Sequence, residues 1–570
     1  MRFALCQTNS LVGNLDHNSR EILDAARTAG EQGADVALFP EMAMMGYPPR
    51  DLIDRPHFIE ATQRRCEQLA GELKGCGVHT VIFGSLHTVD VHAGVPVRNT
   101  AVVVQDGRIL GYADKMLLPN YDVFDESRYF QPAEGPTLID LGPAGAKETV
   151  RIGISVCEDI WNDGQLNPHP RYLVDPIEAM VKGGAQIILN LSSSPFERNK
   201  QAYRRTLVRH AAGRHGVPVL YVNAFGATDD IIFDGGSMAA DAQGSLLIEL
   251  PPFQRKIATV EITPAIAPAS AAHRAAWKVP AAAPTTLEAQ DDGVLDALIL
   301  GTKEYFRKSG FTRAILGLSG GIDSALVASL AMLALGKENV AGYSMPSRYS
   351  SDHSKEDAAI LAGNLGIGFD SLHIEKAFPA LLETLAPVFA NRPPDVAEEN
   401  MQARIRGLIL MAISNKNNAL LLTTGNKSEV AMGYCTLYGD MNGALNPIGD
   451  IYKTEVYRIC RRVNLRLGRT VIPERSFTKA PSAELRPNQT DQDTLPPYDL
   501  LDEILFRYVD QKLGVDEIAR QGYDPALVRK IARSVERCEY KRRQSAIILK
   551  VSPKAFGFGR RMVVAKSDFA

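Results

Sequence analysis

The stretch Arg313-Ala-Ile-Leu-Gly-Leu-Ser-Gly-Gly-Ile-Asp-Ser324 decides the fold of the second half of the chain. Its apolar beginning, Arg313–Leu318, predicts a short buried strand, and Ser324–Leu335 predicts a helix. The glycines between them let the backbone approach an anion, which the free N–H groups at a helix start attract. Strand, glycine-rich loop and helix in this order predict a doubly wound parallel sheet with its ligand at the carboxyl ends of the strands.

The segments on either side of this loop support the same architecture. A helix is expected over Gly293–Lys308, and further strands over Val340–Ser344 and Ala419–Thr423. The tail, Val509–Ala570, is predicted to be helical and then basic. Residues 287–570 are therefore predicted to form one α/β domain.

The first half of the chain alternates short apolar runs with helical stretches. Runs bounded by Gly, Pro, Asn or Asp are typical of buried strands in layered α/β domains. The runs are Phe3–Thr8, Val36–Phe39, Thr80–Ser85, Thr100–Val104, Arg151–Cys157, Gln186–Leu191 and Pro218–Asn223. They predict a separate domain over residues 1–264, followed by an Ala- and Pro-rich linker at 265–286.

Length and composition set the class of protein. A chain of 570 residues is too long for one core. Its 63 basic and 66 acidic residues nearly cancel, so we expect no nucleic-acid or membrane partner. The chain has no spanning apolar run, its start turns polar too soon for a signal peptide, and its seven cysteines show no CxxC spacing. These features predict a soluble cytoplasmic protein with reduced thiols.

Three residues associated with predicted strands suit attack on an amide or nitrile carbon. Cys157 ends a buried strand where the chain turns, and Glu41 and Lys115 also follow β-rich runs. A cysteine becomes a useful nucleophile when a base takes its proton and a cation favours the thiolate. A carboxylate can supply the base, and an ammonium can hold a developing oxyanion.

Each of the three residues also has an ordinary structural explanation. A cysteine at a strand end is usually a packing residue, a glutamate after Phe-Pro can cap a helix, and a lone lysine is usually solvated. Spacing alone does not choose between these explanations and a catalytic site.

The local sequences around the three residues resemble the carbon–nitrogen hydrolase, or nitrilase, superfamily over about residues 1–262. Phe39-Pro-Glu-Met, Leu118-Pro-Asn-Tyr-Asp-Val-Phe-Asp-Glu-Ser-Arg-Tyr-Phe130 and Asn190-Leu-Ser-Ser-Ser-Pro-Phe196 are similar to the glutaminase branch fused to NAD synthetases. The resemblance implies a four-layer α-β-β-α sandwich. It also implies that Glu41 is the base, Lys115 the stabilising cation and Cys157 the nucleophile that forms a glutamyl thioester.

The same resemblance implies a glutamine-binding set, namely Tyr121, Ser194 and Lys200, with Glu126 as a supporting second carboxylate.

The loop in the second half favours nucleotide binding. A Gly-Gly pair alone is more often a turn, and the Gly-Lys-Ser/Thr ending of a Walker loop is absent. The full string, however, resembles the PP-loop of ATP pyrophosphatases, which transfer AMP to a carbonyl oxygen. The ATP-binding residues implied are Gly317, Leu318, Ser319, Gly320, Gly321, Ile322, Asp323 and Ser324. Asp323 is also a candidate ligand of Mg²⁺.

Flanking strings resemble the NAD synthetase family. They are Asn400-Met-Gln-Ala-Arg-Ile-Arg406, Leu422-Thr-Thr-Gly-Asn-Lys-Ser-Glu429, Tyr438-Gly-Asp440, Lys479-Ala-Pro-Ser-Ala-Glu-Leu485 and Glu539-Tyr-Lys-Arg542. The resemblance implies that Thr424, Lys453 and Ser482 contact ATP. It implies that Asn400, Arg404, Glu429 and Lys541 contact deamido-NAD, with Glu429 also a candidate Mg²⁺ ligand. Capping and ion pairing are the structural alternative for Thr424, Glu429 and Arg404.

The chain departs from stand-alone, ammonia-using synthetases at three positions. Leu437 and Ala444 stand where those proteins carry Lys and Asp, and Tyr540 stands where they carry His. Contacts made by those residues are therefore not transferred to this chain.

The two resemblances together predict ATP-dependent amidation of deamido-NAD with ammonia released from glutamine. ATP is a substrate in this scheme, Mg²⁺ is the expected metal, and a homo-oligomer with an ammonia route is implied. A nitrilase-type amidase with a nucleotide-sensing second half is one alternative. Another is a PP-loop amidotransferase with a different acceptor, such as a GMP synthetase, although those usually carry a Cys-His-Glu glutaminase. A non-catalytic scaffold leaves both strings unexplained.

Overall fold

The computed structural model of the chain describes residues 1–90, 94–146, 148–167, 169–281, 284–487 and 489–567. The chain divides into two compact units. The first comprises Met1–Thr228 and Ile232–Thr285, and the second comprises Asp229–Ile231 and Thr286–Ala570. The main boundary, after Thr285, falls inside the predicted linker, and each unit is described by itself.

The first unit contains two six-stranded mixed sheets. One has the order β14-β1-β2-β3-β4-β5, in which β1, β2 and β3 run parallel. Its strands are β1 (Arg2–Gln7), β2 (Val36–Leu38), β3 (Thr80–Thr88), β4 (Val97–Gln105), β5 (Arg108–Asp114) and β14 (Lys256–Glu261). The other has the order β13-β12-β9-β8-β7-β6, in which β7, β8 and β9 run parallel. Its strands are β6 (Thr137–Leu141), β7 (Val150–Val156), β8 (Ile187–Ser192), β9 (Val219–Asn223), β12 (Met238–Ala240) and β13 (Leu246–Glu249).

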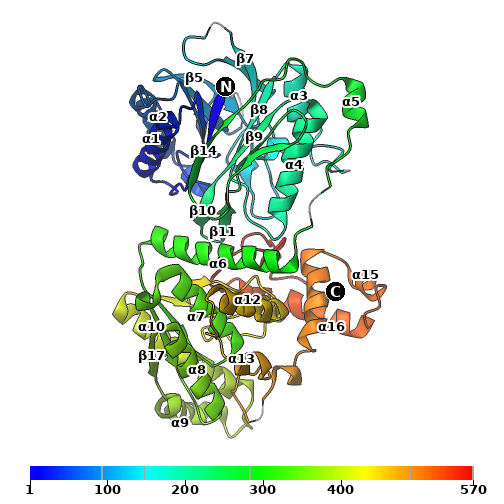
Figure 1. Cartoon of the computed structure of the whole chain (residues 1–570). Helices are drawn as coiled ribbons and strands as arrows, with labels where there is room; N and C mark the ends of the chain where they lie inside the picture. The colour runs from blue at the N-terminus through cyan, green and yellow to red at the C-terminus, as the bar shows by residue number, and fades with distance from the viewer. Residues whose placement is uncertain (91–93, 147, 168, 282–283, 488, 568–570) are drawn as a thin grey trace. The chain divides into compact units, whose positions relative to one another are not determined.

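Helices cover the outer faces of these two sheets (Figure 1). Buried side chains of α1 (Leu15–Glu31) and α2 (Pro56–Glu72) pack on the first sheet, and those of α3 (Pro176–Lys182) and α4 (Lys200–His215) pack on the second. A third apolar cluster, which includes Leu38, Ile82, Ile154 and Leu189, fills the space between the sheets. The predicted α-β-β-α sandwich is therefore confirmed. Two further strands, β10 (Phe225–Thr228) and β11 (Ile231–Asp234), form a separate hairpin.

The segment predicted as a linker is not extended chain throughout. It contains the short helix α5 (Ala271–Ala276), which packs against α4. The ring of Trp277 lies over Gly213 of α4. The Nε2 atom of His273 is hydrogen-bonded to the Gly213 carbonyl oxygen at 3.0 Å. The helix was missed because its six residues are too few to display a periodic pattern, so tertiary contact with α4 decides its structure.

The second unit has a six-stranded parallel sheet of order β17-β16-β15-β18-β19-β20. Its strands are β15 (Ala314–Gly317), β16 (Val340–Ser344), β17 (Gly368–Ser371), β18 (Leu420–Leu422), β19 (Leu445–Asn446) and β20 (Ile547–Ile548). The order reverses between β15 and β18, which lie side by side. This confirms the predicted doubly wound sheet and places its switch point at the loop after β15.

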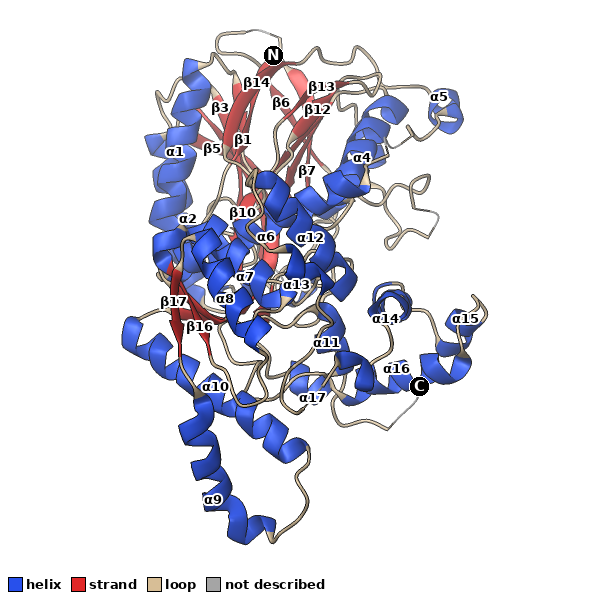
Figure 2. Cartoon of the chain, turned by 60° about the horizontal axis from the view of Figure 1, so that its bottom comes forward, coloured by secondary structure: helices blue, strands red, loops and turns tan. Residues whose placement is uncertain are grey.

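Helices flank both faces of this sheet. In Figure 2, α7 and α8 lie on one side of β16 and β17, and α10 lies on the other side. An apolar cluster that includes Ile315, Ile405 and Leu421 joins α10 and α9 to the sheet. The helices are α6 (Leu287–Ser309), α7 (Ile322–Leu335), α8 (Asp352–Leu365), α9 (Ala377–Phe389), α10 (Val396–Asn417), α11 (Lys427–Met432), α12 (Lys453–Arg466), α13 (Glu474–Thr478), α14 (Tyr498–Leu505), α15 (Val515–Ala519), α16 (Pro525–Arg537) and α17 (Glu539–Arg542). A further cluster ties α11, α14 and α16 together around Leu501 and Ile531.

Candidate active sites

The ends of three strands bring Glu41, Lys115 and Cys157 into one buried site in the first unit. Glu41 lies three residues beyond β2, Lys115 directly follows β5, and Cys157 directly follows β7. The Nζ atom of Lys115 lies 2.8 Å from Oε1 of Glu41. Strands of both sheets therefore supply this cluster, whose three members the family resemblance had named together as a catalytic set.

Lys115 is completely buried between two carboxylates. Its Nζ also donates to Glu126, at 2.9 Å from Oε1 and 2.8 Å from Oε2. The hydroxyl of Tyr47 donates to the same Glu126 at 2.9 Å. Burial opposes the ammonium, but Glu126 and Glu41 outweigh it and raise the pKa of Lys115 well above its usual value. The lysine is therefore a fixed cation.

The carboxylate of Glu41 is held from several directions. The amide of Asn99 donates to Oε1 at 2.7 Å, and the backbone N–H of Ser193 donates to Oε2 at 3.0 Å. Gly84 on β3 makes this packing possible, since a Cβ there would lie 2.6 Å from the Cα atom of Glu41. The carboxylate of Glu41 is thus oriented before any substrate enters.

Cys157 occupies a tight turn at the end of β7. Its φ of 44° lies in the left-handed region, and it begins a 3-10 turn that ends at Ile160. Burial, with the nearby Glu41 carboxylate, raises the pKa of the Cys157 thiol well above its usual value, although Lys115 acts in the opposite direction. The resting thiol is therefore protonated, and a nucleophilic role requires a base.

A pocket of about 360 Å³ opens onto Cys157. Three of the four residues predicted to bind glutamine line it: Tyr121, Ser194 and Lys200. The fourth, Glu126, does not belong to the lining; it lies buried behind Lys115. Its position supports the description of a second carboxylate but not that of a direct ligand.

The second predicted site surrounds the loop that follows β15. The loop closes on itself, because the Ser319 hydroxyl lies 3.2 Å from that of Ser324 and accepts the N–H of Gly321 at 3.2 Å. Gly320 has a φ of 78°, and a Cβ there would lie 2.3 Å from the carbonyl oxygen of Ser354. Only glycine fits this position. Thr424 follows the neighbouring strand β18, so it lies at the same sheet edge.

Charged residues converge on the first turn of α7. Asp323 forms an ion pair with Lys453 and accepts a hydrogen bond from Asn426 at 3.0 Å. The Nζ atom of Lys453 lies 4.0 Å from Glu429. Burial, and then the carboxylate of Asp323, raise the pKa of Glu429 well above its usual range. The structure therefore brings Asp323, Glu429 and Lys453 together, from three separate segments.

Ser482 lies in a neighbouring pocket of about 490 Å³, together with His353, Lys479 and Glu484. Its hydroxyl is used within its own segment, because it donates to the carbonyl of Gln489 at 2.6 Å. The same hydroxyl accepts the backbone N–H of Glu484 at 3.1 Å, so both of these hydrogen bonds stay within residues 482–489.

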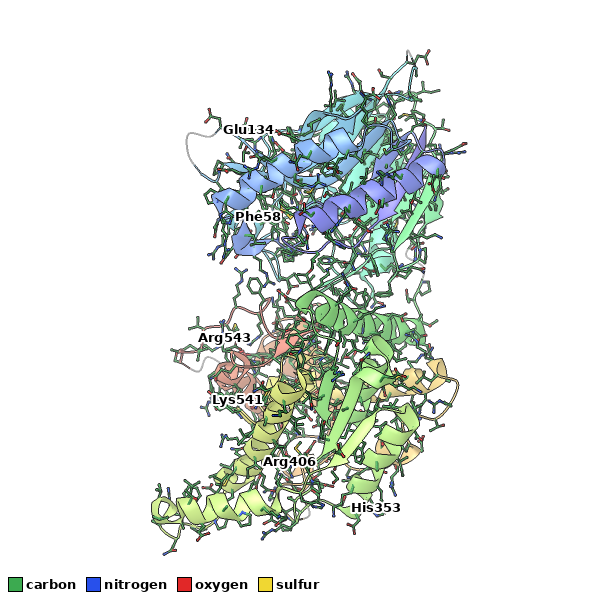
Figure 3. The ribbon with its side chains drawn as sticks, turned by 90° about the vertical axis from the view of Figure 1, so that its left-hand side faces the viewer. Phe58, Glu134, His353, Arg406, Lys541 and Arg543 are labelled. Atoms are coloured by element: carbon green, nitrogen blue, oxygen red, sulfur yellow. The ribbon has the colours of Figure 1, made fainter. Side chains whose placement is uncertain are left out.

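Three residues predicted to contact deamido-NAD surround the backbone segment 433–437. Asn400 accepts from the Thr436 hydroxyl at 2.8 Å, and Arg404 donates to the Leu437 carbonyl at 3.2 Å. Lys541 donates to the carbonyls of Gly433 and Cys435, both at 2.7 Å. Figure 3 places Lys541 near α10. These contacts hold the segment, whereas Glu429 belongs to the cluster around Asp323.

The comparisons with known proteins decide the family. Residues 2–269 match the family described as carbon–nitrogen hydrolase, and residues 294–545 match NAD synthase. A glutamine-dependent NAD(+) synthetase of Synechocystis sp. is 43% identical over 567 residues, covering 99% of this chain and 98% of the relative. The chain belongs to the glutamine-dependent NAD+ synthetase family. A Thermotoga maritima relative of the same name is 41% identical over 589 residues, covering 99% and 98%.

A solved structure of this family supports the same assignment over the whole chain. The glutamine-dependent NAD+ synthetase of Acinetobacter baumannii, in complex with ADP, is 35% identical and has a TM-score of 0.73. The alignment covers 99% of this chain and 98% of that one.

Sequence reasoning missed several residues in and around the pocket that opens onto Cys157. Glu158 accepts from the hydroxyls of Tyr121, at 2.9 Å, and of Tyr172, at 3.3 Å. Trp161 stacks on Tyr203 with ring centroids 5.5 Å apart, and both line the pocket. The string Cys157-Glu-Asp-Ile-Trp161 was a usable signal, because residues of a turn beside a nucleophile tend to face its substrate.

One further group of metal-ligand types lies near this pocket. Ligand atoms of Asp163, Asp175 and His215 lie within 4.8 Å of one another. However, the guanidinium of Arg214 pairs with Asp163 and lies 3.6 Å from Asp175. This cation already occupies the space between the two carboxylates, so the group is explained as an ion-pair network.

Among the described residues, none of the helices combines the length and the apolar character needed to cross a membrane.

Proposed function

We propose that this chain forms NAD+ from deamido-NAD, ATP, glutamine and water, and releases glutamate, AMP and pyrophosphate. One observation carries the proposal: a buried Glu–Lys–Cys cluster and a phosphate-type loop at a sheet switch point occur in one chain that matches NAD+ synthetases over 99% of its length.

Glutamine hydrolysis is assigned to the first unit. Glu41 takes the thiol proton of Cys157, whose sulfur attacks the side-chain amide carbon of glutamine. Lys115 stabilises the negative charge that develops on the amide oxygen. The proton then passes to the leaving nitrogen, ammonia departs, and water hydrolyses the thioester to glutamate. The raised pKa of the Cys157 thiol supports this order, because the proton must leave during attack.

Glutamine is held in the pocket by opposite charges. A free amino acid carries one ammonium and one carboxylate, and the pocket supplies Glu158 and Lys200 for them. The apolar rings of Trp161 and Tyr203 cover the substrate's methylene groups, and Tyr121 orients Glu158. Ser194 completes the polar lining.

ATP binding is assigned to residues 317–324, with Thr424, Lys453 and Ser482 around it. The start of α7 offers N–H groups to phosphate, and Lys453 adds a cation beside Asp323. Asp323 and Glu429 supply carboxylate oxygens, the donors that Mg²⁺ accepts alongside substrate phosphates. Bound Mg²⁺ would neutralise phosphate charge near the carboxylate that receives AMP.

Deamido-NAD is assigned to the neighbourhood of segment 433–437, near Asn400, Arg404 and Lys541. In this scheme these side chains support the segment or exchange their carbonyl partners for the dinucleotide. Adenylation of the nicotinate carboxylate makes AMP a leaving group, and ammonia displaces it. Because most free ammonia is protonated at neutral pH, a shielded route between the sites is part of the proposal, as are the homo-oligomer and the cytoplasmic location.

The test separates the two sites with one variant. Cys157→Ala should abolish glutamine-supported NAD+ formation and leave ammonium-supported formation within about twofold, because only the nucleophile is lost. NAD+, AMP and glutamate are measured with glutamine or ammonium chloride as the nitrogen source. Loss of both activities in a folded variant contradicts the two-site scheme, and ATP-modulated amidase activity without AMP favours an amidase with a regulatory second half.

A further inference from the structure

Asp159 lies two residues after Cys157 but outside the glutamine pocket. Its side chain is buried, with 1% of its surface exposed, and it is not among the pocket-lining residues. The carboxylate therefore has no route to the substrate. Its position next to the nucleophile calls for a different explanation.

The carboxylate of Asp159 joins two segments that come from different sheets. Oδ1 accepts the backbone N–H groups of Met116, at 3.1 Å, and Leu117, at 2.8 Å. Oδ2 accepts the N–H of Val156, at 2.9 Å. Met116 and Leu117 directly follow Lys115, and Val156 directly precedes Cys157. One side chain thus connects the chain segment of the cation to the turn of the nucleophile.

This connection is directional, whereas the packing between the sheets is not. Lys115 follows β5 of one sheet and Cys157 follows β7 of the other, and apolar side chains fill the space between the sheets. Apolar contacts resist separation but allow small sliding movements, while three N–H bonds to one carboxylate fix both segments in register. Misplacement by about 1 Å is enough to lower a catalytic rate about 100-fold.

We propose that Asp159 is a positioning residue that sets the distance between the Lys115 ammonium and the Cys157 thiol. It acts through the backbone of both segments and touches no substrate atom. This inference rests on the proposed glutaminase role of the first site.

Burial and the three N–H contacts act on the ionisation of Asp159 in opposite directions. Burial raises its pKa to about 7, while the N–H of Val156 and the charge of Lys115 favour the ionised form. An ionised carboxylate has lone pairs free for all three N–H groups, whereas a protonated one has a smaller acceptor capacity.

The experiment compares Asp159→Ala and Asp159→Asn with the full-length protein. Asp175→Ala is the matched control, because that carboxylate also accepts a backbone N–H, from Glu178 at 3.0 Å, but caps α3 and touches neither catalytic segment. Three quantities are measured: kcat and KM for glutamine hydrolysis, the alkylation rate of Cys157 by iodoacetamide, and ammonium-supported NAD+ formation.

We expect Asp159→Ala to lower kcat for glutamine about 100-fold with KM within about threefold, because the pocket is intact while the reacting groups are displaced. The alkylation rate of Cys157 should also differ from that of the wild type. Ammonium-supported NAD+ formation should stay within about twofold of the wild-type rate. Asp159→Asn, which keeps one acceptor oxygen, should lie between the wild type and the alanine variant. The Asp175 control should keep the wild-type kcat.

Two results would overturn the inference. One is a wild-type kcat and alkylation rate in Asp159→Ala; the other is an equal loss of kcat in the folded Asp175 control. If the alanine variant does not fold, Asp159→Asn decides: an unchanged kcat and alkylation rate in it reject the role. The proposed function is judged separately, because it fails when the wild type forms no NAD+ from glutamine. The alkylation rate of Cys157 in the Asp159 variants, divided by that in the wild type, tests the role of Asp159 without any turnover.

Discussion

At the residue scale, the first site is governed by the balance of buried charge. Glu41 and Glu126 share one cation, Lys115, so this buried group of three carries one excess negative charge when both carboxylates are ionised. Burial, and the proximity of Glu41, raise the pKa of Glu126 to about 7, even though Lys115 lowers it. A proton on Glu126 therefore relieves the excess negative charge of this buried group.

This balance predicts a pH-dependent stability difference for Glu126→Gln. Between the ordinary glutamate pKa and about 7, folded Glu126 keeps a proton that the unfolded chain has released. Stability of the wild type therefore falls with rising pH in this window, by at most about 1.4 kcal/mol per pH unit. The glutamine variant lacks this loss, so its stability relative to the wild type should improve as pH rises from about 5 to about 7. Urea unfolding of both proteins across that pH range measures this difference in stability. Glu261→Gln, which alters an exposed carboxylate, is the control; a pH-independent difference for Glu126→Gln contradicts the prediction.

Gly320 offers a second prediction at this scale. Gly320→Ala places a Cβ 2.3 Å from the Ser354 carbonyl in a left-handed backbone, so the loop must shift. We expect NAD+ formation to fall more than about 10-fold with either nitrogen source, and stability to fall by about 1–3 kcal/mol. Gly293→Ala in α6 is the control, since a Cβ there meets nothing within 4 Å and alanine favours the helix. If Gly320→Ala used ATP at the wild-type rate, the assignment of this loop to the ATP site would be wrong.

At the element scale, a row of ion pairs fixes α12 against α6. Arg458, Arg462 and Arg466 are spaced four residues apart on α12, and they pair with Asp291, Asp292 and Asp296 of α6 at 2.9, 2.5 and 2.5 Å. Spacing by four residues places the arginines on one helical face. These pairs therefore set the register between a helix that precedes the phosphate loop and the helix that begins with Lys453.

The members of this row should differ in their contribution to stability. Asp291 is 2% exposed, so Arg458→Ala removes the cation beside a buried carboxylate and should cost about 2–4 kcal/mol. Arg466→Ala breaks a pair whose two side chains are about one-third exposed and should cost less than about 1 kcal/mol. Chemical denaturation of both variants measures the difference, and equal costs would show that burial does not decide the strength of these pairs.

At the scale of the whole molecule, each unit has its own core. The first unit encloses three apolar clusters between and outside its sheets, and the second encloses separate clusters around its parallel sheet and its C-terminal helices. All seven cysteines are free, so no disulfide contributes to either unit. Apolar burial therefore stabilises each unit.

A shortened chain tests whether the first unit is self-sufficient. We expect residues 1–285 to fold with cooperative unfolding, because the strands of both sheets and their covering helices lie within this range. Iodoacetamide should alkylate Cys157 in this fragment at a rate within about threefold of the full chain, since Glu41 and Lys115 are also present. Cys157→Ser in the same fragment assigns the signal. A molten or aggregated fragment would show that the first unit needs the second for folding.

Much of the fold was predictable because strands of buried sheets read as short apolar runs. The run Val340–Ser344 is the observed β16 residue for residue, and Thr80–Ser85 is the core of the longer β3. The hairpin strand β5 and the helix α5 were missed, since β5 alternates exposed and half-buried residues and α5 is too short for a period.

The sequence by itself determined the family, both fold classes and the chemical types of the reactive residues, because strand-end strings such as Phe39-Pro-Glu-Met and the loop at 317–324 are local. Only the tertiary structure decided how further side chains join these sites. It placed Glu126 behind Lys115, brought Glu158 into the pocket, and joined Asp159 to the segment after Lys115. The reason is physical: these contacts cross between strands far apart in the chain, and their geometry depends on how two sheets pack, which no local pattern encodes.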